Sequence, residues 1–253
     1  MTEYFPESTY SVDSTLTRAN LKKGDIVTGK VVEIKKAQKY LIVDLGSLKA
    51  KMSFEHCSIY KIQTHSGMID PNIYLLYGKI IRAKVVEVGE TIILSRNELM
   101  EEALDYFKTT NPSKFEVSII GFTKLSAIVD VGAGIHGRIV PSEFAKTHFN
   151  DIQDIGLPIG YQFTARNLSY TDSIKTFELS RVAILSSEPN HLNIDDIVTF
   201  KAFKNLDGDK CYLGLIDKKY PALLNSKVKL SYGKEVQTII KKITAKGFIL
   251  KSL

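Results

Sequence analysis

Hydrophobic and polar residues alternate along most of this chain in short runs, which glycines or polar clusters separate. Runs of this kind, rich in Val and Ile, are typical of half-buried β-strands. Between Leu21 and Arg96 the pattern predicts five strands, in the runs IVTGKVVEI, YLIVDLG, LKAKMSF, GKIIRAKVVEV and TIILSR. The connection from Glu55 to Tyr77 carries a glycine, a proline and scattered apolar residues, which predicts a loop with one short helical turn.

One stretch has a helical period instead. From Asn97 to Lys108, apolar residues recur three or four positions apart, with acidic residues near the start. The apolar residues are Leu99, Met100, Ala103, Leu104 and Phe107. Asn111 and Pro112 follow, and a proline cannot continue a helix. The sequence therefore predicts a linker helix over 97–110.

The strand pattern recurs twice more along the chain. In the second copy, FEVSIIGF, SAIVDVG, GIHGRIV, GYQFTARNLSY and KTFELSR match the first copy strand by strand, and both copies close on Leu-Ser-Arg. The third, more divergent copy opens at Asp196 with DIVTFK. Five short strands per copy without crossover helices are typical of small closed barrels. The chain is therefore predicted to be all-β, with three tandem antiparallel five-stranded barrels of the oligonucleotide-binding (OB) type over 21–96, 111–184 and 191–253.

Residues 1–20 show no clear strand or helix period and carry three aromatic residues, Tyr4, Phe5 and Tyr10. Two interpretations remain open. The segment is either a disordered terminus or a docking segment whose rings become buried on a partner.

The charge balance favours a polyanionic partner. The chain of 253 residues has 34 Lys and Arg against 28 Asp and Glu, a net charge of +6. Its two cysteines, Cys57 and Cys211, lie in different copies, which argues against a disulfide framework and for a reducing compartment. No run approaches the roughly 18 apolar residues that cross a bilayer, and the start is typical of neither a secretion signal nor a transit peptide. We expect a protein that works where it is made, or whose presequence has been removed.

The run GAGIHG satisfies the dinucleotide-binding pattern G-x-G-x-x-G at Gly132, Gly134 and Gly137. That site needs a helix after the last glycine, whose N-terminus holds the pyrophosphate. Here the following residues, RIVPSEF, predict a strand that ends at Pro141. We therefore interpret the glycines as a hairpin turn that needs positive φ angles, and expect no nucleotide cofactor.

No pattern in the chain indicates catalysis. The five histidines lack metal-binding spacing, and no serine-centred nucleophile motif is present. The acidic pairs Glu101-Glu102 and Asp195-Asp196 are better explained as solvated caps at a helix and a strand entry than as acid–base groups. The prediction is a protein without metal, cofactor or enzymatic activity.

Basic and aromatic residues are interleaved on the predicted strands of all three copies. Lysines and arginines track phosphates and exposed rings stack on bases, so such surfaces bind single-stranded nucleic acid. For any one residue, a solvated charged face or a core ring explains the pattern equally well, and the recurrence in three copies favours the binding interpretation. The candidates are Tyr40, Lys49, Lys51, Arg82, Lys84, Phe122, Lys124, Arg138, Arg166, Phe203, Lys204, Lys210, Tyr212, Lys219, Tyr220 and Lys241.

Most of the chain resembles the S-one family of bacterial-type small-subunit ribosomal proteins, which are built from tandem S-one RNA-binding domains. GDIVTGKVVEI with YLIVDLG looks like the first repeat of the family, and GETIILSRNELMEEALDYF resembles its exit strand and linker helix. FEVSIIGF, AIVDV and GIHGRIVPSEF look like the second repeat, and DIVTFK like the start of the third.

The resemblance implies a structural component of the small ribosomal subunit that binds ribosomal RNA and helps capture and position mRNA for translation. It implies that the first repeats anchor to the ribosome, largely through small-subunit protein two, with Thr2 to Leu16 as the docking segment. The short, basic, Lys-, Ile- and Asn-rich chain further implies an organelle-encoded, mitochondrial form, with a bacterial cytoplasmic form or a fragment of a longer protein as alternatives.

Two departures from the family pattern bear on RNA binding. RNA-binding S-one domains carry G-x-F-V and G-L-x-H, where this chain has Tyr40-Leu41-Ile42-Val43 and Arg138-Ile139-Val140. The missing Phe and His imply anchoring by the first two repeats and RNA contact by the third, near Tyr212 and Tyr220. Two other functions remain open: an S-one-repeat scaffold that binds precursor ribosomal RNA, and the RNA-binding part of an RNA-processing enzyme.

Overall fold

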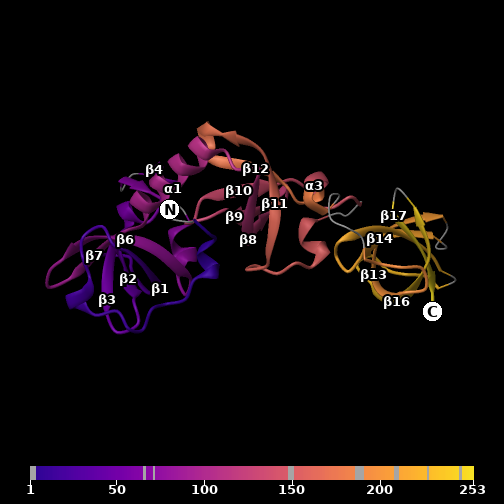
Figure 1. The fold of residues 1–253 in the computed structure, drawn as a ribbon, viewed down its shortest axis with the longest axis horizontal. Coiled ribbons are helices and arrows are strands. Elements are labelled where there is room, and N and C mark those ends of the chain that lie inside the picture. The colour runs from indigo at the N-terminus through magenta and orange to yellow at the C-terminus, as the bar shows by residue number, and fades with distance from the viewer. Residues whose placement is uncertain are drawn as a thin grey trace. The chain divides into compact units, whose positions relative to one another are not determined.

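The computed structural model describes residues 4–64, 67–70, 72–147, 151–185, 191–207, 211–226, 228–244 and 247–253. Within these residues the chain forms three closed five-stranded barrels, coloured in chain order from indigo to yellow in Figure 1. This confirms the predicted all-β class with three tandem OB-type barrels. Among the described residues, no helix is both long and apolar enough to cross a membrane.

Barrel 1 has the strand order β1-β2-β3-β7-β6. Its strands are β1 (Ile26–Lys35), β2 (Tyr40–Asp44), β3 (Lys49–Ser53), β6 (Ile80–Val88) and β7 (Ile92–Ser95). Alternate residues of each strand point inward and form one core, which includes Val31, Leu41, Met52, Ile81 and Leu94. The period-2 pattern of the sequence therefore predicts both where the strands lie and which of their side chains face the core.

Barrels 2 and 3 repeat this topology with the orders β10-β12-β11-β8-β9 and β13-β14-β15-β17-β16. The strands of barrel 2 are β8 (Lys114–Thr123), β9 (Ser126–Asp130), β10 (His136–Ile139), β11 (Gln162–Thr171) and β12 (Thr176–Ser180). The strands of barrel 3 are β13 (Ile197–Asp207), β14 (Cys211–Ile216), β15 (Tyr220–Asn225), β16 (Glu235–Thr244) and β17 (Gly247–Ser252).

The expectation of purely antiparallel barrels is wrong, because β3 pairs with β7 and β15 pairs with β17 in parallel. A closed ring with an odd number of strands cannot alternate in direction all the way round. The parallel pair brings Lys51 of β3 beside Ile93 of β7.

Helix α1 (Arg96–Thr110) begins one residue before the predicted linker helix and ends where predicted. The Ser95 side chain caps it by accepting a hydrogen bond from the Glu98 amide, and Asn111 ends it in the left-handed region at φ 41°. All five apolar residues of the predicted helical face are buried. The shorter helices are α2 (Pro141–Phe144) and α3 (Arg181–Leu185).

The predicted loop between Glu55 and Tyr77 contains more structure than expected. A small hairpin of β4 (Ile62–Thr64) and β5 (Gly67–Ile69) lies between the 3₁₀ turns η3 (Phe54–His56) and η4 (Ile73–Leu76). The other 3₁₀ turns are η1 (Glu7–Thr9), η2 (Arg18–Asn20), η5 (Ile152–Ile155) and η6 (Asp172–Ile174).

The three glycines of GAGIHG do not share one role. Gly132 and Gly134 have positive φ angles of 140° and 78° in the turn before β10, as predicted. Gly137 is instead a buried residue within β10 and has no positive φ angle, which corrects that part of the prediction. Strand β10 rather than a helix contains the last glycine, as predicted, but it ends at Ile139 and the short helix α2 begins at Pro141.

The described chain divides into two compact units. Unit 1 comprises 1–118, 130–137 and 170–177, and unit 2 comprises 119–129, 138–169 and 178–253. The division runs through barrel 2, whose β9–β10 turn belongs to unit 1 together with barrel 1 and α1.

Candidate nucleic-acid interface

The outward side of β2 and β3 in barrel 1 carries a tyrosine and two lysines. Alternation along β3 buries Ala50 and Met52 in the core and leaves Lys49 and Lys51 exposed. The Lys51 ammonium lies 5.1 Å from the centroid of the half-buried Tyr40 ring on β2. This distance is typical of a cation–π contact, so the pair forms a polar edge beside an aromatic face.

A second pair of the same kind lies next to the first. The Lys36 ammonium, from the β1–β2 turn, is 4.8 Å from the ring centroid of Tyr74 in η4, and Tyr74 is 47% exposed. The Tyr74 and Phe54 rings form a T-shaped pair with centroids 6.2 Å apart. The Phe54 amide donates to the carbonyl of Lys39, the residue before Tyr40, at 2.9 Å. We call the set Lys36, Tyr40, Lys49, Lys51 and Tyr74 the barrel 1 face.

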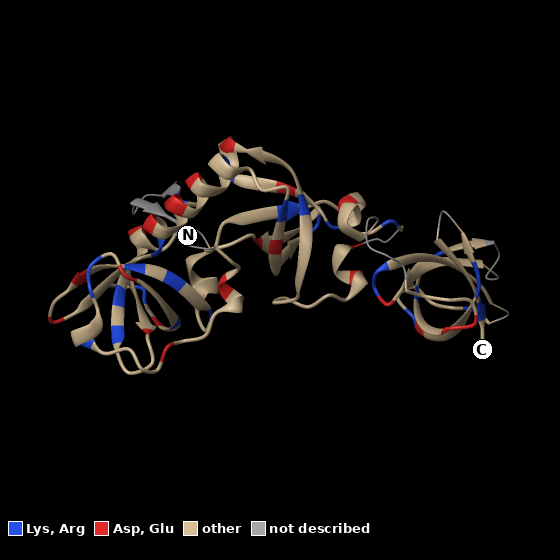
Figure 2. Cartoon of the chain, in the orientation of Figure 1, with Lys and Arg blue, Asp and Glu red and all other residues tan. Residues whose placement is uncertain are grey.

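Lys36, Lys49 and Lys51 form no ion pair with any residue that the structure describes. The parallel neighbour of Lys51 is Ile93, which offers no counter-charge. Figure 2 shows blue Lys and Arg segments on several strands of barrel 1. The barrel 1 face therefore combines two rings with three cations that are available to a polyanion.

Sequence reasoning found Tyr40, Lys49 and Lys51 but missed Lys36 and Tyr74. The segment of Tyr74 lies outside the strand runs, so the sequence pattern predicts only a connection there. The apolar and aromatic run IYLLY was the one sign of a structured turn in that segment. In the structure Ile73 is buried and Tyr74 is exposed on the 3₁₀ turn η4.

The other two candidates of barrel 1, Arg82 and Lys84, have partners within the chain. The Arg82 guanidinium lies 4.1 Å from the Tyr10 ring centroid, and its Nη1 donates to the Tyr10 hydroxyl at 2.9 Å. Lys84 forms an ion pair with Glu102 of α1. Both cations lie on β6, which the N-terminal segment and α1 cover, so they are less available to a ligand than the barrel 1 face.

The rings of the N-terminal segment lie mainly against the chain itself. Tyr4 packs 5.5 Å from Tyr106, Tyr10 carries the Arg82 guanidinium, and Phe5 is 38% exposed. A docking role for Tyr4, Phe5 and Tyr10 stays a prediction. Phe5 is the most exposed of these three residues.

Barrel 2 offers a weaker surface. Glu178 accepts hydrogen bonds from Arg138 Nε at 3.0 and 3.1 Å and forms an ion pair with its Nη2 at 2.8 Å. Lys124 and Arg166 are exposed, and Phe122 is half-buried. Arg138, which occupies the position of Lys51 in barrel 2, is therefore already paired with a carboxylate of the neighbouring strand β12.

Two aromatic candidates of barrel 3 are buried. Tyr212 is 2% exposed, with its hydroxyl bonded to the Leu230 amide at 2.9 Å, and Phe203 is 3% exposed. Tyr212 belongs to the core cluster of barrel 3, so the core interpretation holds for it and the binding interpretation is wrong. Phe203 is buried outside that cluster, with its ring centroid 5.8 Å from that of Tyr232, so its ring is not exposed for stacking on a base. A β-bulge between Ala202 and Lys204 interrupts the alternation of β13 at Phe203.

The remaining candidates of barrel 3 are mixed. The Lys219 ammonium lies 5.2 Å from the Tyr220 ring centroid at the β14–β15 turn. Lys241 is paired with Asp195 at 2.8 Å, and Lys204 is exposed. Lys210 lies outside the described residues. The expected concentration of RNA contacts in the third copy is therefore not supported by these side chains.

No family model matches the chain, and no curated protein matches it. Among solved structures, GSP13 from Bacillus subtilis is 20% identical at a TM-score of 0.28, over 32% of this chain and 61% of that one. A Streptococcus pneumoniae multidomain protein with nucleic acid binding domains is 8% identical at a TM-score of 0.31, over 90% and 73%. Drosophila Unr CSD456 is 10% identical at a TM-score of 0.20, over 90% and 95%. At these values the fold assignment rests on the strand order of this chain alone.

Proposed function

We propose that this protein binds single-stranded RNA without catalysing a reaction, and that the barrel 1 face is its principal contact. One observation carries the proposal: two lysines lie over two accessible tyrosine rings, Lys51 over Tyr40 and Lys36 over Tyr74. Each ring can stack on a base, at about 1–3 kcal/mol per base. Each ammonium can then leave its ring for the adjacent phosphate, which is the stronger partner for a compact charge.

Among the described residues, no group of His, Cys, Asp and Glu is suited to hold a metal ion. The proposed activity needs none, because stacking and phosphate contacts supply binding without bond making. The chemistry also explains why sequence specificity is expected to be low: every base has a π face, and the lysines contact only the backbone.

Binding is tested with the full chain and a fluorescent single-stranded oligouridine of about 12 nucleotides, within the site size of an OB fold. Fluorescence anisotropy at several salt concentrations gives the affinity and its salt dependence. For three lysine–phosphate contacts we expect a slope of log K against log salt of about −2. A matched duplex is the control, because its stacked bases cannot reach the rings. Absence of binding at low salt, or equal affinity for the duplex, would contradict the proposal.

We further propose that the protein acts as a component of a small ribosomal subunit that helps capture and position mRNA, in an organellar or bacterial setting. This part rests on the resemblance of the strands, the Leu-Ser-Arg exit and the following helix to the S-one family. Co-sedimentation of the chain with purified small subunits at low salt tests it, with large subunits as the control. If the chain binds RNA but pellets with neither, the ribosomal role fails while RNA binding stands.

A further inference from the structure

The Leu-Ser-Arg exit of the first two barrels repeats a detailed local structure. Ser95 and Ser180 are both fully buried, and each side chain caps the helix that follows, accepting from the amides of Glu98 at 3.4 Å and Ala183 at 2.9 Å. The next residue is an arginine at the first helical position, and both arginines, Arg96 and Arg181, are buried. A buried guanidinium needs partners for its five N–H groups, so each arginine must be held by surrounding structure.

Each arginine first bonds a carbonyl of its own barrel. Arg96 Nη1 donates to the Cys57 carbonyl at 3.0 Å, and Arg181 Nη1 donates to the Phe144 carbonyl at 3.2 Å. Cys57 directly follows η3 and Phe144 ends α2, so both carbonyls come from the segment after the third strand of the barrel.

Each arginine also reaches the following barrel, at the turn between its second and third strands. A Cβ at Gly134 would lie 1.9 Å from Arg96 Nη2, so only glycine leaves room for the guanidinium. Arg181 Nη2 donates to the Lys218 carbonyl at 3.2 Å. Gly134 and Lys218 occupy the same place, two residues before β10 and β15, and both have positive φ angles, 78° and 59°. The first contact lies within unit 1 and the second within unit 2.

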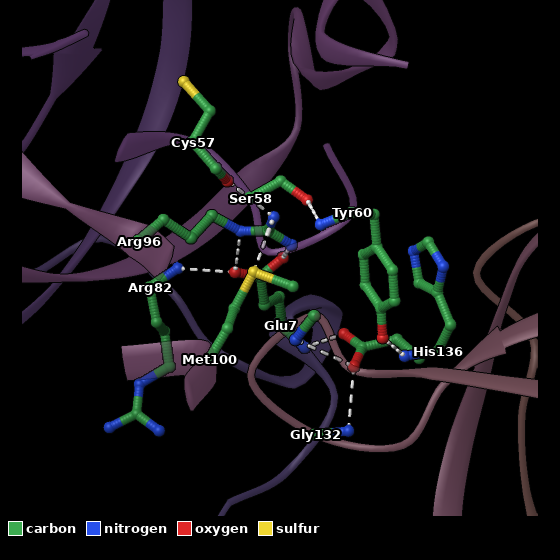
Figure 3. Close-up of polar contacts among 11 residues, drawn as sticks. Glu7, Cys57, Ser58, Tyr60, Arg82, Arg96, Met100, Gly132 and His136 are labelled. Carbon is green, nitrogen blue, oxygen red and sulfur yellow. Dashed lines mark hydrogen bonds and ion pairs between the residues drawn. The ribbon is translucent and has the colours of Figure 1, made fainter. Parts of the chain in front are cut away.

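The N-terminal segment completes the first of these contacts. Glu7 accepts hydrogen bonds from Arg96 Nε at 2.8 Å and Nη2 at 2.7 Å. The Glu7 amide donates to Asp130 Oδ2 at 2.7 Å, and the amides of Gly132 and Gly134 donate to Asp130 Oδ1 at 2.8 and 3.0 Å. Figure 3 shows the Glu7 carboxylate beside the Arg96 guanidinium, with bonds that lead on to the turn of Gly132.

The backbone of the N-terminal segment also packs directly against the turn 131–135. The Ala133 amide donates to the Phe5 carbonyl at 3.0 Å, and a Cβ at Gly132 would lie 2.6 Å from the Tyr4 carbonyl oxygen. The second contact uses other groups: Lys218 Nζ donates to the Gly156 carbonyl at 3.0 Å, and the Arg181 guanidinium packs 5.4 Å from the Phe144 ring.

We propose that the arginine of each Leu-Ser-Arg exit is a joint residue that fastens its barrel to the second turn of the next barrel. The first joint comprises Arg96 and the turn 131–135 and is closed by Glu7. The second comprises Arg181 and the turn 217–219. The first joint lies within unit 1 and the second within unit 2, and each holds the exit of one barrel against a turn of the next.

Hydrogen exchange followed by mass spectrometry of the full chain tests the two joints separately. Lysine keeps the charge of arginine but cannot make several fixed contacts at once. Arg96→Lys is expected to speed amide exchange about tenfold in 131–135 and to leave 217–219 unchanged, because one net hydrogen bond is worth about that factor. Arg181→Lys is expected to do the reverse. Arg138→Lys, at a half-exposed arginine of barrel 2 that touches neither turn, is the control.

Faster exchange at both turns in each variant, or at neither, would overturn the proposal. A variant that fails to fold does not remove the test, because the wild-type chain has its own readout. Nuclear Overhauser contacts are expected between the guanidinium protons of Arg181 and the α-proton of Lys218, and between those of Arg96 and the α-protons of Gly134. Their absence in the folded wild-type chain would show that the joints do not form.

Discussion

Barrels 1 and 3 share one topology but present opposite chemistry on the second and third strands. In barrel 1, Lys51 lies opposite Ile42, with the Tyr40 ring below the ammonium. In barrel 3 the equivalent pair is Leu213 opposite Leu223, and β14 and β15 contribute no lysine or arginine to that side. The strand order therefore fixes which residues share the outward side of these strands, and a few substitutions decide the chemistry of that side.

Barrels 1 and 2 differ by the neighbour of one cation. Lys51 lies beside Ile93 on the parallel strand β7, whereas Arg138 of barrel 2 is held by Glu178 of β12. Ile93 and Glu178 are equivalent positions in the runs TIILSR and TFELSR. A single residue on the fifth strand thus separates a cation that is open to phosphate from one that is satisfied internally.

The largest effect is expected from removing a ring of the barrel 1 face. Tyr40→Ala should weaken binding of single-stranded RNA by about 5- to 150-fold, the range that loss of one stacked base implies. The ring is only half-buried, so the thermal midpoint should change little. The control is Tyr220→Ala, which removes the ring that lies under Lys219 in barrel 3. Equal losses in anisotropy titrations of the two variants would contradict the distinction between the barrels.

An exchange of the fifth-strand residue tests the second comparison. Ile93→Glu places beside Lys51 the counter-charge that Arg138 has in barrel 2, and should weaken RNA binding by about tenfold while lowering the salt slope by about 0.7. Glu178→Ile frees Arg138 and should steepen the salt slope by a similar amount. Both variants are measured by anisotropy over a salt series. If Ile93→Glu leaves the slope unchanged, Lys51 does not contact phosphate.

A third comparison concerns two equivalent aspartates. Asp44 and Asp130 each accept the amide two residues ahead, from Gly46 at 2.9 Å and Gly132 at 2.8 Å, but Asp44 is half-exposed and Asp130 is buried. Burial, and then the nearby Glu7 carboxylate, raise the pKa of Asp130 to about 7, against the lowering effect of the amides that it accepts and of Arg96.

The raised pKa of Asp130 means that the folded chain holds a proton between about pH 4 and pH 7 that the unfolded chain has lost. Its contribution to the free energy of unfolding is therefore greatest at low pH and is lost as the pH rises through about 7. Burial lowers the pKa of His136 to about 4, so that group has the opposite trend.

The substitution Asp130→Asn separates the two trends. The stability advantage of the wild type over Asp130→Asn should shrink as the pH rises from about 5 to about 8, because only the wild type has this carboxyl group. Thermal unfolding across that range measures the difference, with Asp44→Asn as the matched control. An advantage that grows with pH would show that Asp130 titrates below its ordinary range.

The fold was predictable because its signals are local. Alternation located the strands of all three barrels, and the spacing of Leu99, Ala103 and Phe107 located α1. The repeated Leu-Ser-Arg exit was visible as a motif, and its structural role was not. Arg96 donates to Glu7 and Cys57, which lie 89 and 39 residues away along the chain, and no local pattern connects it with them.

The candidate site was less predictable for two physical reasons. In β14 both faces are apolar, so alternation could not decide that Tyr212 points inward. Phe203 is buried outside the core of barrel 3, against the Tyr232 ring, and no strand pattern predicts that contact. The pairing of Arg138 with Glu178 joins strands that are 40 residues apart. Such contacts depend on register, which sequence patterns leave open when neither face is clearly polar.

The smallest effect is expected from adding to barrel 3 the outward lysine that barrel 1 has at Lys51. Leu223→Lys places a cation at the position equivalent to Lys51, on a half-buried residue of β15, and should steepen the salt slope of RNA binding by about 0.7. The affinity gain should be only about threefold, because no equivalent of the Tyr40 ring lies beside it. Val228→Lys, at an exposed residue that follows β15, adds the same charge away from that face and is the control. If the two lysines have the same effect, the position of a cation on the second and third strands does not matter, and net charge alone explains RNA binding.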